Sequence, residues 1–336
     1  VAVSGSANEV TNAANPVTIT LIQKANGEIV ADSSTGVVGN FGGLDVDVQK
    51  ADGNRQLIAV LRSGLAENQV SLYEGALASV VGLNEGAVNV ASMLNTLSAD
   101  TAAAGSDFVI ASAQGGKYES DTGGKITSNV FTADVGVGRN VNDRLFYGAF
   151  LDYGTSSYET ENDYALNRVE GSGDASHIGL GLFAKGLFGD AYQSALTLSA
   201  RAGIASNTYS ATRITNTNSK TIIDNAELNR MYYGVSAELS HKFMSWKDGA
   251  FEIYGGGSYT KVAGDSVAVG GHTYEVDSIN SLIGRVGLKL TEEINDKWSA
   301  YADVAFEREF LGDVDGKHTN GGYKLSDNYN KPSLQG

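Results

Sequence analysis

Three patterns in the sequence carry residue types that could do chemistry. Gly264-Asp265-Ser266 matches the nucleophile block of one class of serine lipases, but it stands where a polar loop begins, and a loop explains it without catalysis. Gly179-x-Gly181-x-x-Ala184 fits a dinucleotide fingerprint, yet it lies inside a strand pattern instead of at a strand–helix turn. Four scattered histidines lack metal-ligand spacing, and no Gly-x-Ser-x-Gly elbow occurs. We therefore expect no catalytic residue, no metal and no cofactor, and a structural or lumen position for His177, His241, His272 and His318.

The ionisable residues that alternate with apolar residues along the predicted strands lie on one face of these strands, opposite the apolar face. A solvated pore wall would explain them if the apolar face is the outer one. A sharper hypothesis is that Arg201, Arg285 or Lys289 meets Glu74 or Glu85 of a preceding helix. The predicted lumen residues are Asp134, Asp152, Lys185, Arg201, Glu238, Glu252, Arg285, Lys289, Asp303 and Glu307.

The strands that must position these residues begin near Phe108, where the apolar pattern acquires a period of two. In the second strand, Phe131 and Val135 point one way and Asp134 points the other. Nine such segments are predicted, near 108–118, 126–139, 145–158, 174–187, 192–209, 230–243, 250–262, 280–291 and 298–310. Their length and their continuous apolar face, with charge and glycine opposite, are typical of an outer-membrane barrel, since a soluble barrel keeps its apolar side chains inside.

The connections between these strands alternate in length, as they do in such barrels. Short turns are predicted at 139–144, 188–191, 245–249 and 292–297, and long polar loops near 159–172, 210–229, 263–279 and 311–322. Aromatic residues gather near strand ends, as expected for interfacial girdles. They are Phe146, Tyr147, Tyr153, Tyr158, Tyr232, Tyr233, Trp246, Tyr254, Tyr259, Trp298 and Tyr301.

A helix is predicted within residues 66–97, where apolar residues recur at steps of three and four. Glycines inside it each cost a free helix about 1 kcal/mol relative to Ala, which makes sense if the helix must pass through a confined space. We expect it to thread the pore, although packing against the N-terminal segment is an alternative. Its predicted pore residues are Leu72, Glu74, Gly75, Leu77, Gly82, Leu83, Glu85 and Gly86.

The composition agrees with a long antiparallel sheet. Gly is 42 of 336 residues, whereas Pro is only 2, and Pro removes a ladder donor. A net charge of −15 makes a nucleic-acid partner implausible, because nucleic-acid affinity depends on Lys and Arg. Cysteine is absent, which excludes disulfides and thiolate metal sites. Residues 1–65 read as a β-rich stub that resembles the last rungs of a solenoid.

From about residue 66 to the end, the chain resembles the autotransporter β-domain of pertactin-type proteins. Leu72-Tyr-Glu-Gly75 and Leu83-Asn-Glu-Gly86 are similar to the family's linker helix. Ala113-Gln-Gly-Gly-Lys-Tyr118 looks like its first hairpin, and Tyr301-Ala-Asp-Val-Ala-Phe-Glu-Arg-Glu-Phe310 like a late strand. The Asn-Asn pair that self-cleaving relatives carry at the helix is absent, so we do not expect cleavage inside the barrel.

The resemblance implies an all-β fold, a transmembrane antiparallel up-and-down β-barrel of a twelve-stranded family, with an α-helix in the pore. The expected domains are the end of the passenger at 1–65, a linker and pore helix at 66–104, and the barrel at 105–336. About nine or ten barrel strands are expected here, with a C-terminally truncated barrel that cannot close by itself, because an unpaired edge in hydrocarbon is costly.

The function that the resemblance implies is that of a non-enzymatic translocator and anchor, which exports an N-terminal passenger to the cell surface. The expected partners are outer-membrane lipid, the barrel-assembly machinery and the chain's own passenger in cis, with no nucleic acid and a monomeric state. The alternative is a stand-alone outer-membrane barrel that acts as an adhesin or a small-solute pore. A barrel of that kind would have no use for a stub joined by a long helix.

Overall fold

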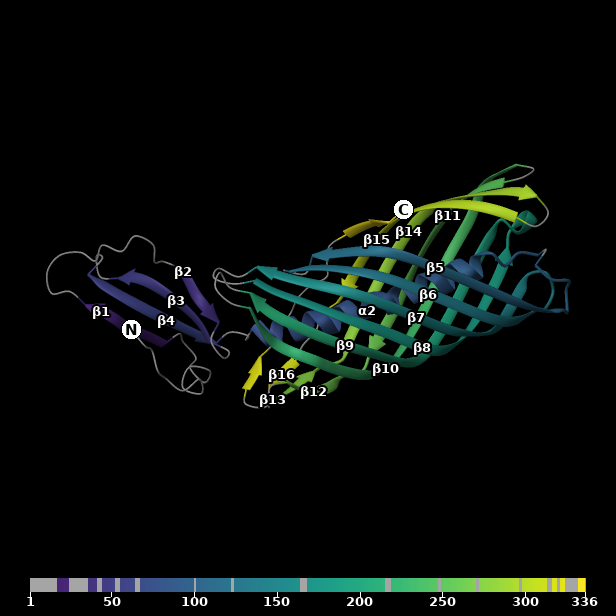
Figure 1. Ribbon diagram of the computed structural model, residues 1–336. Helices are drawn as coiled ribbons and strands as arrows, with labels where there is room; N and C mark the ends of the chain where they lie inside the picture. Colours follow the sequence, from purple (N-terminus) through teal and green to yellow (C-terminus); the bar gives the residue numbers. More distant parts are fainter. Residues whose placement is uncertain are drawn as a thin grey trace.

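In the residues that it describes, the structure, a computed structural model, has three antiparallel sheets and one long helix (Figure 1). It describes residues 17–23, 36–40, 44–51, 55–63, 67–99, 101–121, 124–163, 168–214, 219–246, 249–269, 272–295, 298–312, 316–318, 321–323 and 332–335.

The largest sheet has ten strands that pair in chain order, each antiparallel to the next. It curls into a half-barrel around the helix α2, Glu67–Asn95 (Figure 1). Its strands are β5 (Asp107–Asp121), β6 (Lys125–Asn140), β7 (Leu145–Asp163), β8 (Arg168–Phe188), β9 (Ser194–Ile214), β10 (Ser219–Trp246), β11 (Gly249–Val262), β14 (Ile279–Asn295), β15 (Trp298–Leu311) and β18 (Pro332–Gln335). All nine predicted strands are therefore confirmed, and within the described residues β5 and β18 form the two edges.

The apolar face of the sheet points outward, as the alternation predicts. Val135, Leu180 and Leu288 are 52%, 66% and 53% exposed. Their neighbours in sequence point the other way, and Asp134 is only 1% exposed on the concave side. The sheet therefore has an apolar convex surface and a polar concave surface, the arrangement of a membrane barrel.

The two ends of the half-barrel differ. At one end the strands are joined by short connections, such as 141–144 and 189–193, the latter containing the 3₁₀ turn η1 (Asp190–Tyr192). At the other end β7 to β10 continue beyond their predicted limits, and the ladder still pairs Glu161 with Glu170. The loops predicted at 159–172 and 210–229 are wrong for this reason, since most of their residues are paired strand.

A small sheet lies at the end where the strands are long (Figure 1). It contains β12 (Asp265–Val269), β13 (His272–Val276), β16 (Gly316–His318) and β17 (Gly321–Tyr323), paired in that order. Part of the loop predicted at 263–279 is thus a hairpin.

The N-terminal segment forms a separate sheet, with strand order β1-β4-β3-β2. Its strands are β1 (Val17–Gln23), β2 (Gly36–Asn40), β3 (Leu44–Ala51) and β4 (Gln56–Ser63). All three pairings are antiparallel, so the expected solenoid-like stacking is wrong. The physical reason is that connections as short as 41–43 and 52–55 allow a hairpin, whereas parallel rungs need a much longer crossover.

Candidate functional site: the helix-filled lumen

The helix α2 lies in the concave side of the half-barrel and contacts β5 to β11 (Figure 1). By length and composition it could cross a membrane, but 72% of its apolar window is buried within the structure. The predicted segment 66–97 is confirmed as a helix, and the predicted position in the pore agrees with these contacts.

Apolar side chains surround the first half of α2 at the end where the strands are long. Leu72, Leu77 and Leu83 are at most 2% exposed. They belong to one buried cluster with inward residues of the sheet and with Val267, Val269, Tyr274 and Val276 of the β12–β13 hairpin. The hydroxyl of Tyr73 donates a hydrogen bond to the Glu275 carbonyl of that hairpin, at 3.3 Å. We call this cluster the outer seal.

A second apolar cluster surrounds the last turns of α2 at the end with short connections. It joins Val90, Met93, Leu94 and Leu97 to Phe108, Phe146, Phe150, Phe183, Leu187 and Ala195 of the barrel wall. Phe146 is fully buried and lies edge-on to Phe108, with ring centroids 6.1 Å apart. We call this cluster the inner seal. The described lumen thus has an apolar cluster near each end, and a polar cluster lies between the two.

The polar middle is organised by Asp152 of β7, whose side chain is completely buried. Its carboxylate accepts hydrogen bonds from Arg201 of β9 at 2.7 Å and from the Tyr232 hydroxyl of β10 at 2.8 Å, and it contacts His177 Nε2 at 3.0 Å. A buried carboxylate is stable only when it is paired and hydrogen-bonded, and these three contacts meet that requirement.

Arg201 reaches the helix, but not through a glutamate. Besides Asp152, its guanidinium donates a hydrogen bond to the Leu83 carbonyl of α2. The expected pairing of Arg201 with Glu74 or Glu85 is therefore wrong, because Arg201 forms its ion pair with Asp152, another residue of the wall. The expected pairing of Arg285 is also wrong, since Arg285 lies 3.5 Å from Asp303 and 3.0 Å from Glu307.

Neutral side chains of the wall contact the two predicted helix carboxylates. Glu74 accepts a hydrogen bond from Asn162 of β7, and Glu85 accepts one from the Tyr118 hydroxyl of β5 at 2.6 Å. The predicted wall acids are likewise met by helix amides. Asn89 donates to Asp134 at 2.6 Å, and Asn95 donates to Glu238 at 2.6 Å. Amide–carboxylate hydrogen bonds are therefore one kind of polar contact between the helix and the wall.

The other predicted lumen residues lie on the far strands. Arg285, Asp303 and Glu307 form the group on β14 and β15, which Tyr254 joins through a 2.7 Å hydrogen bond to Asp303. Glu252 and Lys289 are direct cross-strand partners on β11 and β14. A cleft of ≈ 80 Å³ separates part of this wall from Ser92, Asn95 and Thr96 of the helix.

The helix glycines allow close approach, as expected. A Cβ on Gly75 would stand 2.7 Å from the Tyr209 ring, and one on Gly86 would stand 2.7 Å from the Arg201 guanidinium. Gly82 has more room, since its Cβ would meet Ser156 Oγ only at 3.4 Å. Two of the three predicted glycines therefore mark places where the backbone touches the wall.

Sequence reasoning missed the aromatic residues that fill the lumen. Phe146, Tyr158, Tyr232 and Tyr254 were assigned to outer girdles but are at most 4% exposed inside, whereas Tyr147, Tyr153, Tyr233 and Trp246 do face outward. Period-two alternation requires this split, because Phe146 and Tyr147 cannot share a face.

The Phe183 ring lies over wall glycines, and a Cβ at Gly148 would meet it at 2.6 Å. Alternation could also have found Arg230, which shares the face of Glu238 and is 3% exposed.

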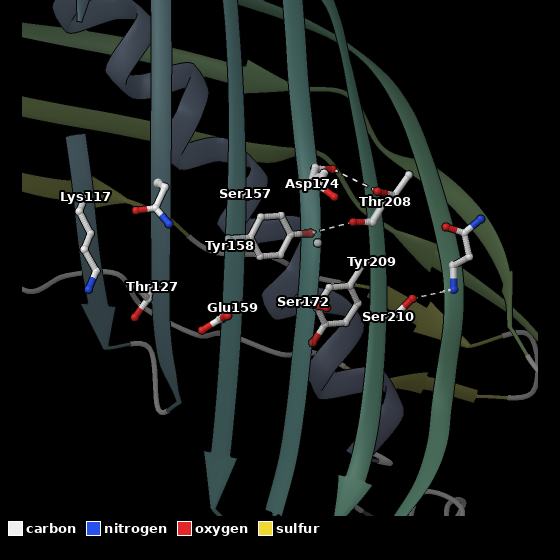
Figure 2. Close-up of a pocket in the computed structure, with 13 residues that line it drawn as sticks. Lys117, Thr127, Ser157, Tyr158, Glu159, Ser172, Asp174, Thr208, Tyr209 and Ser210 are labelled. Carbon is white, nitrogen blue, oxygen red and sulfur yellow. Dashed lines mark hydrogen bonds between the residues drawn. The ribbon is translucent and has the colours of Figure 1, made fainter. Parts of the chain in front are cut away.

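A hollow of ≈ 500 Å³ lies at the long-strand end of β5 to β10, and Figure 2 shows its lining. Most of the lining belongs to the outward face, where Asn129, Ser157, Asp174 and Thr208 are successive cross-strand partners. Further along the same strands Val135, Leu151 and Leu180 form an apolar row in register. The outer face thus changes from apolar to polar between these rows, as expected where a barrel leaves the hydrocarbon.

The groups that could have done chemistry have structural contacts. The Asp265 carboxylate accepts hydrogen bonds from the backbone N–H groups of Ser266 and Asn229. His241 lies 2.9 Å from the Ser194 hydroxyl. His272 and His318 belong to β13 and β16 of the small sheet. Within the described part of the chain, no group of three His, Asp or Glu residues could hold a metal ion.

The comparisons with known proteins identify the family. The model of the autotransporter β-domain matches residues 109–333. The chain belongs to the autotransporter β-domain family. The transport unit of the autotransporter AIDA-I from Escherichia coli is a structural neighbour, with 13% sequence identity, 80% of this chain and 86% of that chain covered, and a TM-score of 0.46. No curated protein matches the chain. As an autotransporter β-domain, the chain is an outer-membrane translocator component, whose family carries a passenger in cis.

Proposed function

We propose that this autotransporter β-domain exports an N-terminal passenger to the cell surface through its lumen and then anchors it, with α2 left in the pore. One observation carries the proposal. The helix that follows the N-terminal sheet in the chain runs inside the half-barrel, and the wall contacts it from Tyr73 to Asn95. A chain that had passed through the pore would leave its last segment in this position.

The ends of the half-barrel support the direction of export. Outer-membrane barrels have short periplasmic turns and longer extracellular segments. Tyr73 near the start of α2 contacts the β12–β13 hairpin at the end with long strands, and Lys185 near the end with short connections contacts the helix terminus. Everything upstream of α2 would therefore lie outside the cell.

The filled lumen favours this role over that of an open small-solute pore. Both seals bury apolar side chains of α2 against the wall. We propose two further partners, which are lipid at the apolar outer face and the barrel-assembly machinery. We also propose that the chain is a monomer. We also propose that the chain itself performs no enzymatic chemistry.

The test is surface exposure of an epitope tag in intact cells. A tag placed at the N-terminus of the full chain is expected to be removed by added protease, while the barrel remains intact. A control tag between Asn142 and Asp143, in a short connection, is expected to be cleaved only after the outer membrane is permeabilised. The proposal fails if the N-terminal tag is protected until permeabilisation.

A further inference from the structure

Three cationic side chains of the wall share one kind of contact with α2. Arg230 of β10 donates a hydrogen bond to the Ala76 carbonyl at 3.4 Å and Arg201 of β9 donates to the Leu83 carbonyl. Lys185 of β8 donates to the carbonyls of Leu94 and Asn95, both at 3.0 Å. All three side chains are buried, and they come from three neighbouring strands. The positive charges that touch the helix therefore contact its main chain.

The contacted carbonyls form a line along the helix. Ala76, Leu83 and Leu94 are seven and eleven residues apart in sequence. Since an α-helix has 3.6 residues per turn, these steps are close to two and three full turns, and the three carbonyls lie on one side. The three cations follow the same line along the wall, from the outer seal to the inner seal.

The contacts of Arg201 and Lys185 do not depend on the side chains of the helix, whereas Arg230 also donates a hydrogen bond to the Ser79 hydroxyl at 2.8 Å. Arginine and lysine are donors only, and every residue of a polypeptide offers a carbonyl oxygen with two lone pairs. Inside the helix the second lone pair of Ala76 or Leu83 can accept from the wall. At the C-terminus, where α2 has no basic residue of its own in the last turn, the Lys185 cation lies at the negative end of the helix dipole and donates to the last carbonyls.

We propose that Lys185, Arg201 and Arg230 form a main-chain-binding track, which receives the carbonyl groups of any polypeptide that passes through the lumen. The inference rests on the proposed export function. Exported segments differ in their side chains, so a wall that must hold all of them can rely only on the backbone. An extended chain presents a carbonyl at every residue, about 3.3 Å apart, so each forward step brings a new acceptor to the donors. The track holds the chain against return, and α2 is the last segment to occupy it.

The experiment removes donors and measures the rate of export. Among the described residues, Lys185 and Arg230 donate hydrogen bonds only to α2, so Lys185→Met and Arg230→Met leave no wall carboxylate unpaired. The control is Lys220→Met, which removes an exposed cation from β10, the strand that also carries Arg230. The full chain carries either a neutral Ser/Thr/Gly-rich passenger or an acidic one. After pulse labelling, the appearance of protease-accessible passenger on intact cells gives the rate.

The double variant is expected to slow both passengers by the same factor, about tenfold, which corresponds to about 1.4 kcal/mol in the barrier to export. The control is expected to export at the wild-type rate. An unchanged or faster rate in the double variant overturns the track, and so does a slowing confined to the acidic passenger, which would indicate attraction to side-chain charge.

Two further arms separate the possible failures. Folding is checked by the heat-dependent migration of the barrel on gels. If the double variant does not fold, the conservative double variant Lys185→Arg and Arg230→Lys is used, because it keeps the donors. It is expected to export both passengers at a rate similar to that of the wild type. A large loss of export in this variant, when it is folded, overturns the track. If the wild-type chain exports neither passenger, the proposed function itself fails. If the wild type exports and the variants match it, only the track fails.

Discussion

At the scale of single residues, the glycines of α2 decide how closely the helix approaches the wall. The same substitution at two of them is expected to have opposite effects. Gly75→Ala places a Cβ 2.7 Å from the rigid Tyr209 ring, so the helix must shift and the outer seal must loosen. Gly82→Ala meets only Ser156 at 3.4 Å and gains about 1 kcal/mol of helix propensity. Single-channel conductance in planar bilayers should rise for Gly75→Ala and stay low for Gly82→Ala. Equal conductance in the two variants would contradict the geometry.

Residue-level reasoning from sequence found the face of each side chain but not its partner. Alternation correctly placed Asp134 and Arg201 on the lumen side, because a period of two fixes the face of a strand residue. It could not show that Arg201 meets Asp152 from two strands away, since this contact depends on register and on the curl of the sheet. The sequence did not identify Tyr118 and Asn162 as the partners of Glu85 and Glu74. Many neutral polar residues lie on the lumen face of the predicted strands, and the alternation does not distinguish these two from the others.

At the scale of elements, the inner seal joins the last turns of α2 to β5, β7, β8 and β9. Phe146→Ala removes a fully buried ring from this seal, with an expected cost of about 3 kcal/mol in unfolding free energy and a higher conductance. Its sequence neighbour Tyr147 is 50% exposed on the outer face, so Tyr147→Ala is the control and should leave the conductance unchanged. Equal effects on conductance would show that the ring does not close the lumen.

The elements themselves were largely predictable. Nine strands and the helix follow from apolar periods of two and of three to four, which are strong signals in long segments. The long-strand ends of β8 to β10 were missed because their outward face turns polar while the backbone ladder continues. The antiparallel pairing of the N-terminal sheet could have been inferred from its short connections, such as 52–55.

At the scale of the whole molecule, the account depends on α2 lying inside the barrel, against β7. The chain offers a direct test because it contains no cysteine. A Cβ on Gly82 would stand 3.7 Å from the Cβ of Ser156, within the range that a disulfide requires. The pair Gly82→Cys and Ser156→Cys therefore reports the position of the helix without competing thiols. The matched control is Gly82→Cys with Ser157→Cys, since Ser157 is exposed on the outer face of the same strand.

The most direct measurement is the yield of this disulfide in outer membranes from cells that produce the full chain, oxidised briefly and analysed on non-reducing gels. The account predicts nearly complete formation for the pair at positions 82 and 156, and none for the pair at 82 and 157. A lack of crosslink at 82 and 156 in a barrel that is otherwise folded, or similar yields for the two pairs, would contradict the placement of α2 in the lumen.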